Sequence, residues 1–201
     1  VKARRNPLQR TRTALAAAAA TPALWLAGGL EFITFVGLYA VKAFLPVYAL
    51  NNEINVAVIG LFFAVQEAVH VLGRPPSGRW SDRVGYSLPI GLGMALLGAA
   101  LPLLAVAPGG AALLGLAVIM GGAQALIFPA TMALLAVQAP PDHLGAGMGL
   151  LGSLQNGGKV VGPMLAGAVL VWLSYGEMFL LMGTLLLAGA LILPARATYR
   201  R

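Results

Sequence analysis

Five ionisable side chains stand inside otherwise apolar stretches of this sequence, and these are the residues best suited to chemistry. They are Glu31, Lys42, Glu67, His70 and Lys159. At bilayer depth such a group costs about 2.5–3.5 kcal/mol or more, so ionisable residues there pair with one another or line a water-filled path. Two carboxylates, two amines and an imidazole favour proton transfer and the binding of charged small molecules.

The spacing of the first four residues predicts their partners. Glu31 and Lys42 are eleven residues apart, which puts them on one helix face but about 16 Å apart along the axis. Each therefore needs a partner on another helix or water in a cavity, although the long Lys42 side chain could instead reach the membrane surface. Glu67 and His70 are neighbours at i, i+3 and could share a proton. A histidine in the headgroup region is the alternative for His70.

Lys159 lies near the middle of its apolar stretch, where its side chain reaches neither membrane surface. Three uncharged polar residues, Gln124, Gln155 and Asn156, stand in the same stretch or the one before it. We expect Lys159 to face a cavity and bind a carboxylate, carbonyl oxygens or an anionic substrate group, with a purely structural ion pair as the alternative. The polar positions together predict a pathway for substrate and protons.

The elements that position these residues are membrane-spanning helices. Hydrophobic residues make up 59% of the 201 residues and charged residues 9%, where a soluble domain has about 25% charged residues. Repeated apolar runs of 18 or more residues indicate helical spans. The predicted spans are 22–50, 56–73, 86–106, 110–138, 144–173 and 177–194. The third and sixth have no charged residue in their apolar centres and could face lipid, whereas the other four hold the polar positions.

The basic residues predict the orientation. Eleven of the 13 Lys and Arg residues lie before the first span, after the second or after the sixth, and the loops after the first, third and fifth spans have none. Basic residues collect on the cytoplasmic side. We therefore expect a multi-pass protein of the plasma membrane with both termini cytoplasmic, divided into a basic linker at 1–20, a six-helix bundle at 21–195 and a basic tail at 196–201. Orientation explains the basic pI better than nucleic-acid binding does.

Two glycine-containing segments have marked spacing. Residues 78–85 read Gly-Arg-Trp-Ser-Asp-Arg-Val-Gly, and the fifth predicted span holds Gly158, Gly162, Pro163 and Gly167. Small residues four apart let another helix approach closely, and the Gly-Pro pair permits bending. In the first segment we expect a tight loop in which Asp82 makes a charge-assisted contact with a basic neighbour.

The first segment resembles the signature loop between the second and third helices of the major facilitator superfamily, at Gly78, Asp82, Arg83 and Gly85, with Tyr86 and Ser87 where that family often has basic residues. The second segment is similar to the family's fifth-helix antiporter motif. The resemblance implies one six-helix half, the C-terminal one, with a 3+3 inverted repeat, a cytoplasmic latch at Asp82 and Arg83, and a missing six-helix half in the same polypeptide.

The resemblance and the buried charges predict a secondary transporter that exports small organic molecules, of the drug or sugar exporter type, in exchange for protons. Proton-coupled uptake of a sugar or organic anion is one alternative, and a non-transporting scaffold or inactive fragment is another. No nucleophile–base arrangement, metal-ligand spacing or phosphate-binding loop is present in the sequence, so we expect neither an enzyme nor a bound cofactor or metal. The expected partners are a small-molecule substrate, protons and the lipid bilayer, and not nucleic acid.

Overall fold

The computed structural model describes residues 7–138 and 144–193, and this part of the chain is all α-helical. Side chains are described from residue 12 onward. The helices, in chain order, are α1 (Pro7–Ala19), α2 (Pro22–Asn51), α3 (Val56–Val84), α4 (Ser87–Leu103), α5 (Gly110–Gln138), α6 (Leu144–Leu170) and α7 (Tyr175–Ile192). Helices α2 to α7 correspond in position to the six predicted spans.

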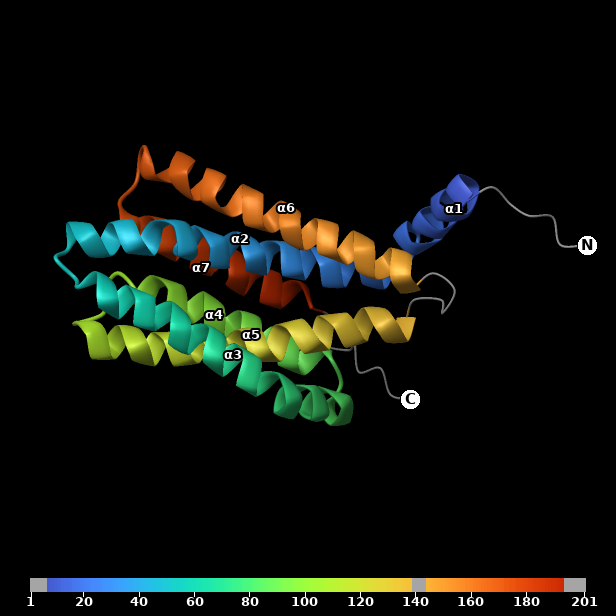
Figure 1. Ribbon diagram of the computed structural model, residues 1–201, viewed down its shortest axis with the longest axis horizontal. Coiled ribbons are helices and arrows are strands. Elements are labelled where there is room, and N and C mark those ends of the chain that lie inside the picture. The colour runs from blue at the N-terminus through green and yellow to red at the C-terminus, as the bar shows by residue number, and fades with distance from the viewer. Residues whose placement is uncertain (1–6, 139–143, 194–201) are drawn as a thin grey trace, which may run out of the picture.

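The six long helices pack in pairs. α2 lies along α6, α3 along α5 and α4 along α7, while α4 also packs on α5 and α2 on α7. Figure 1 shows α2, α6 and α7 on one side of the bundle and α3, α4 and α5 on the other. The turns that follow α2, α4 and α6 lie at one end of the bundle, and the α3–α4 turn lies at the other.

Small residues allow the closest helix contacts. A Cβ atom added at Gly158 or Gly162 of α6 would lie 2.5 Å from the backbone oxygen of Phe32 or Val36 in α2. Gly98 of α4 and Gly183 of α7 contact one another in the same way, each against the other's backbone oxygen. Such contacts are the usual basis of helix association in lipid, where no hydrophobic force draws helices together.

Four helices, α2, α3, α5 and α7, are long and apolar enough to cross a membrane. α4 is equally apolar but has 17 residues. α6 has 27 residues, and its hydropathy is lowered by glycines and by polar residues such as Asn156 and Lys159. The order of the long helices agrees with the sequence analysis, and four of the six predicted spans are long and apolar enough to cross a membrane.

The sequence leaves residues 73–85 as a loop between the second and third predicted spans, and this expectation is wrong for most of the segment. α3 continues through Pro75 and Pro76 to Val84, and only Gly85 and Tyr86 connect it to α4. Gly85 has φ +90° and donates its N–H to the carbonyl of Ser81 over 2.9 Å. This left-handed conformation favours glycine. The helical extension separates Asp82 from Arg83, because adjacent residues of a helix do not face each other.

The amino-terminal segment also differs from a plain linker, because residues 7–19 form α1, which packs against α6. These residues have no apolar periodicity from which a helix could be expected. Residues 1–6 and the tail predicted at 196–201 lie outside the described residues.

Candidate functional site

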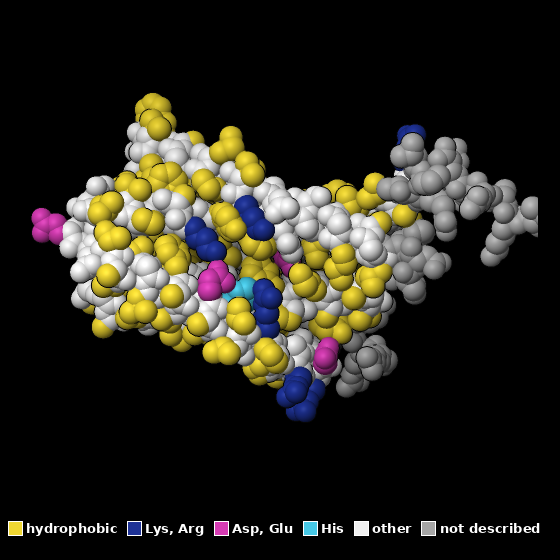
Figure 2. Space-filling view, in the orientation of Figure 1, with side chains coloured by type: hydrophobic (Ala, Val, Ile, Leu, Met, Phe, Trp, Pro, Cys, Tyr) yellow, Lys and Arg dark blue, Asp and Glu magenta, His cyan; other side chains and the backbone are white. Residues whose placement is uncertain are grey.

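A cleft of about 200 Å³ opens on one face of the bundle, between four helices. Figure 2 shows basic, acidic and histidine side chains gathered near the middle of a face that is otherwise largely apolar or uncharged. None of the described residues that line the cleft belongs to α4 or α7. The polar and aromatic lining residues are Phe35, Tyr39 and Lys42 of α2, Glu67, His70 and Arg74 of α3, Gln124 and Phe128 of α5, and Gln155 and Lys159 of α6.

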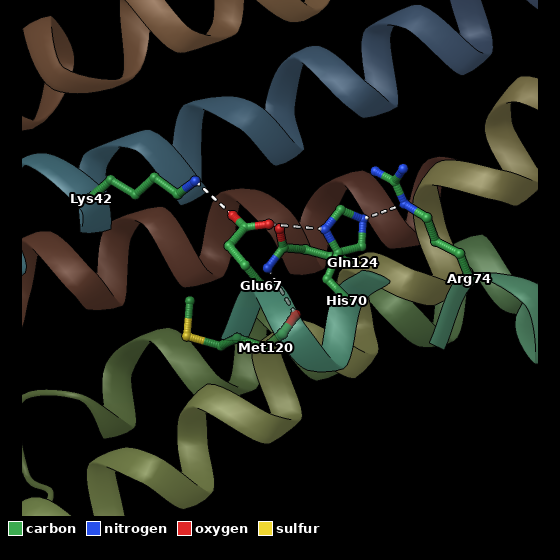
Figure 3. Close-up of polar contacts among 6 residues, drawn as sticks. All are labelled: Lys42, Glu67, His70, Arg74, Met120 and Gln124. Carbon is green, nitrogen blue, oxygen red and sulfur yellow. Dashed lines mark hydrogen bonds and ion pairs between the residues drawn. The ribbon is translucent and has the colours of Figure 1, made fainter. Parts of the chain in front are cut away.

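A continuous chain of charged and polar contacts crosses the cleft from α2 along α3 (Figure 3). Lys42 Nζ donates to Glu67 Oε1 over 2.9 Å, and Glu67 Oε2 lies 3.3 Å from His70 Nδ1. Arg74 Nε then donates to His70 Nε2 over 3.1 Å. Lys42 and Glu67 remain partly exposed in the cleft, whereas His70 is buried.

Helix α3 brings three of these residues together because Glu67, His70 and Arg74 are spaced i, i+3 and i+7, along one face. Their contact with Lys42 depends on packing between helices. On the other side of His70, the Phe128 ring of α5 meets the imidazole edge to face at 5.3 Å between centroids. Gln124, one turn before Phe128, donates to the backbone oxygen of Met120 over 3.2 Å.

Glu31 lies beneath the cleft, with 0% of its surface exposed. Its carboxylate contacts the Thr131 hydroxyl of α5 and the Gln155 amide of α6. Both of these donors are uncharged. Since burial among uncharged donors disfavours an ionised carboxylate, this carboxyl can hold a proton.

Lys159 faces the cleft from α6. Its Nζ donates to Asn156 Oδ1 over 3.1 Å and lies 4.9 Å from the centroid of the Phe35 ring and 5.9 Å from that of Tyr39. No carboxylate forms an ion pair with Lys159 in the part of the chain that the structure describes. An ammonium on aromatic faces, hydrogen-bonded only to an amide, can bind an anionic group without first breaking an ion pair.

The structure brings six of the eight predicted pathway residues to the cleft surface, namely Lys42, Glu67, His70, Gln124, Gln155 and Lys159. The other two, Glu31 and Asn156, each contact one of these six. Glu31 and Lys42 bind partners on other helices and not each other, as their spacing predicted.

The two predicted glycine motifs lie outside the cleft. Gly158 and Gly162 pack against α2, and Gly167 lies 3.4 Å, measured from an added Cβ, from the end of the Phe44 ring. Gly78, Asp82 and Arg83 lie in the last turns of α3. Among the described residues Asp82 has no ion pair, so the structure does not contain the expected ion pair with a basic neighbour in that part of the chain.

Sequence reasoning missed two polar residues of the site. Pro75 and Pro76 predict a loop beside Arg74, yet the position of Arg74 four residues after His70 was a usable signal for a shared helix face. Thr131 is a single threonine in an apolar run, which is common and gives little signal by itself. Its spacing of seven residues from Gln124 puts both on the inner face of α5.

Comparison with known proteins places the chain in a family. A family profile described as the Major Facilitator Superfamily matches residues 27–201. This chain belongs to the Major Facilitator Superfamily. As a member of that superfamily it is a multi-pass membrane protein, and the cleft lies within the matched region.

Two similar proteins are named as resistance proteins. The chain is 30% identical over 172 residues to a "Multi-drug resistance efflux pump PmrA homolog" of Lactococcus lactis, covering 80% of this chain and 42% of the relative. It is 25% identical over 136 residues to "Quinolone resistance protein NorA" of Staphylococcus aureus, covering 68% of this chain and 35% of the relative. The chain thus spans less than half the length of these relatives.

Within described residues 12–138 and 144–193, no group of three or more His, Asp or Glu side chains is close enough together to hold a metal ion.

Proposed function

We propose that this chain is the C-terminal six-helix half of a proton-coupled exporter of small organic molecules. The observation that carries the proposal is the cleft, in which α2, α3, α5 and α6 present charged, polar and aromatic side chains to one open space. Charged groups at membrane depth are costly and mark substrate and ion pathways. The names of both relatives favour export of drug-like compounds over uptake of a sugar or organic anion.

The helix pairing supports six spans arranged as a 3+3 inverted repeat. In such a repeat α2 corresponds to α5, α3 to α6 and α4 to α7. Replacing each helix by its counterpart turns the α2–α6 pair into α5–α3, and the α4–α5 pair into α7–α2. All four of these pairs are in contact. In such transporters the substrate site lies between repeats near the bilayer midplane, and Lys159 lies near the middle of α6.

The cleft residues have different roles in transport, according to their chemistry. Glu31 is the proton-carrying carboxyl, because it is buried and only uncharged groups donate to it. Lys159 and Asn156 hold polar groups of the substrate, and the Phe35 ring beside them packs on its apolar part. The open side of the cleft faces a second six-helix bundle of the same polypeptide, and the two bundles rock about it to expose the substrate to each side in turn.

The distribution of basic residues supports a plasma-membrane orientation with both chain ends and the α3–α4 turn in the cytoplasm. The described basic residues Arg74, Arg79 and Arg83 all lie in the last three turns of α3. The turns at the other end of the bundle contain Glu53 but no Lys or Arg.

The test uses the intact protein that carries this chain, reconstituted in lipid vesicles with an imposed proton gradient. The probes are the cationic dye ethidium, the quinolone norfloxacin and a broad panel of other drug-like compounds. We expect gradient-driven movement of at least one probe, abolished by a protonophore. Glu31→Gln should remove the dependence on the gradient while leaving the protein folded, since an amide oxygen can still accept a hydrogen bond from Thr131. A lack of gradient-driven flux across the whole panel would reject the exporter and favour a scaffold.

A further inference from the structure

The contacts of His70 determine which of its nitrogens carries a proton. A guanidinium only donates hydrogen bonds, and Arg74 Nε donates to His70 Nε2 over 3.1 Å. His70 Nε2 therefore uses its lone pair as an acceptor and has no proton. The remaining ring nitrogen, Nδ1, carries the proton of the neutral imidazole and donates it to Glu67 Oε2, 3.3 Å away. Glu67 is free to accept there because its other oxygen accepts from Lys42.

We propose that His70 Nε2 is a proton-binding site in competition with Arg74, so that each proton taken up there releases the Arg74 side chain from the imidazole. In this step a proton from water forms an N–H bond with the Nε2 lone pair, and the Arg74 hydrogen bond to that lone pair breaks. The N–H of His70 Nε2 and the N–H of Arg74 Nε, both donors on positively charged groups, then face each other. The imidazolium keeps its bond from Nδ1 to Glu67, so the proton and the guanidinium exclude each other at one atom.

The groups around His70 make Arg74 the side chain that responds. From its own helix, Glu67 and Arg74 face the ring, and from α2 the charged Lys42 is already paired with Glu67. α5 presents uncharged groups, Phe128 and Gln124. The α6 amine, Lys159, lines the same cleft but binds Asn156. Among the described residues, only Arg74 places a positively charged hydrogen-bond donor next to His70 Nε2.

The position of Arg74 in α3 gives its release a mechanical effect. The His70–Arg74 contact spans one turn, i to i+4, immediately before Pro75 and Pro76. Proline has no N–H, so the carbonyls of Val71 and Leu72 lose their usual helical partners in this same turn. The side-chain contact thus reinforces the turn of α3 with the weakest backbone. Losing it frees the end of α3, which contains Asp82 and Arg83, to move relative to the cleft.

This inference builds on the proposed transport function, but its first test does not require transport. The intact protein is labelled with ¹⁵N-histidine in lipid nanodiscs, and the imidazole nitrogen shifts are recorded between about pH 5 and 8, the range over which histidines change charge. This chain has two histidines, His70 and His143, and the His70 signals are those missing from His70→Gln. At the upper end we expect a protonated Nδ1 and an unprotonated Nε2. The opposite tautomer would overturn the proposal.

Substitution of Arg74 gives the matched comparison. Arg74→Lys keeps a donor that can reach Nε2, so the Nδ1–H form should persist. Arg74→Met removes the donor that competes for the Nε2 lone pair while Glu67 still accepts from Nδ1, so Nε2 should take up its proton at a higher pH than in the unaltered protein. An unchanged pH of Nε2 protonation in Arg74→Met would show that Arg74 does not compete with the proton at this nitrogen.

The link to transport is tested separately with His70→Gln in vesicles. A glutamine amide can accept from Arg74 and donate to Glu67, but it cannot bind a further proton. We expect the pH dependence of ethidium or norfloxacin transport between about pH 5 and 8 to be reduced. An unchanged pH profile would overturn the role of His70 in coupling. Absence of transport in the unaltered protein would instead reject the proposed function and leave the tautomer result standing.

Discussion

Lys159 shows at the scale of one residue how the cleft can select its ligand. Its ammonium lies over the ring of Phe35 and donates to the uncharged Asn156. A charge held by an amide and an aromatic face, in a helix interior, remains available to a ligand that carries a carboxylate or other acceptor. Its location makes the amine costly for folding, so its role is better explained by binding than by stability.

For the proposed exporter, we predict that Lys159→Met abolishes transport of acceptor-bearing compounds such as norfloxacin without unfolding the protein. Methionine retains contact with Phe35 through its apolar chain but removes the ammonium, with its charge and its hydrogen-bond donors. Hydrogen bonds to charged groups contribute about 1.5–3 kcal/mol, so affinity should fall by about tenfold to a hundredfold. The measurement is substrate binding and vesicle uptake alongside thermal unfolding. Lys159→Arg, which keeps the charge, is the control, and unchanged uptake by the methionine variant would exclude this role.

Which residues form the site could be read largely from the sequence, because ionisable groups in apolar helices are few and costly. The hydrogen-bond partners of these residues could not be read from the sequence. The bonds from Thr131 and Gln155 to Glu31 join residues 100 and 124 positions apart, and only the packing of α5 and α6 against α2 decides them. Periodicity determines the face on which Glu31 and Lys42 lie but carries no information about what that face meets.

Among the elements, α6 is defined by how closely it approaches α2. Gly158, Gly162 and Ala166 are buried at intervals of four on the side that faces α2. A second row of small residues, Gly145 and Gly149, has open space where a Cβ atom would lie. The two rows have the same spacing in the sequence, and spacing alone does not tell which row meets a neighbouring helix.

The contrast between the rows predicts unequal effects of the same substitution. In Gly162→Ala the new Cβ would lie 2.5 Å from the Val36 carbonyl oxygen and 3.1 Å from its Cα, so α2 and α6 must move apart. Overpacking of this kind costs about 1–3 kcal/mol. Gly149→Ala meets nothing within 4 Å and should be neutral or stabilising by up to about 1 kcal/mol. Unfolding of both variants in detergent is the measurement, and equal stabilities would contradict this assignment of the packing face.

The end of α3 shows why turn residues alone mislead. Pro75, Pro76 and Gly78 form a segment that sequence rules assign to a loop, because proline lacks a backbone donor. The structure nevertheless continues the helix past both prolines as far as Val84. The true chain reversal is at Gly85, whose positive φ ends the helix. Tertiary packing therefore overrides the local preference, and the continuous helix keeps Arg74 beside His70.

For the whole molecule, the helix order and most helix boundaries follow from the apolar runs. The predicted spans 22–50 and 110–138 differ from α2 and α5 by no more than one residue at either end. The proposed exporter needs more than these helices, because no residue of α4 or α7 lines the described cleft and the chain covers 42% and 35% of its two relatives. We propose that a second six-helix bundle covers the open side of the cleft, and its residues lie outside this sequence.

The proposed membrane topology can be tested directly, because this chain has no cysteine and each introduced thiol is unique within it. Asn51→Cys and Val106→Cys lie at exposed positions near the turns after α2 and α4, and Arg79→Cys and Asp82→Cys at exposed positions near the end of α3. In a full-length protein whose other cysteines are replaced, a membrane-impermeant maleimide should label the first two in intact cells and the last two only after the membrane is opened. Six spans put an even number of crossings between the chain ends, and the basic end of α3 then belongs in the cytoplasm. Labelling of Arg79→Cys from outside would invert the orientation, and labelling of Asn51→Cys and Asp82→Cys from the same side would show that α3 does not cross the bilayer.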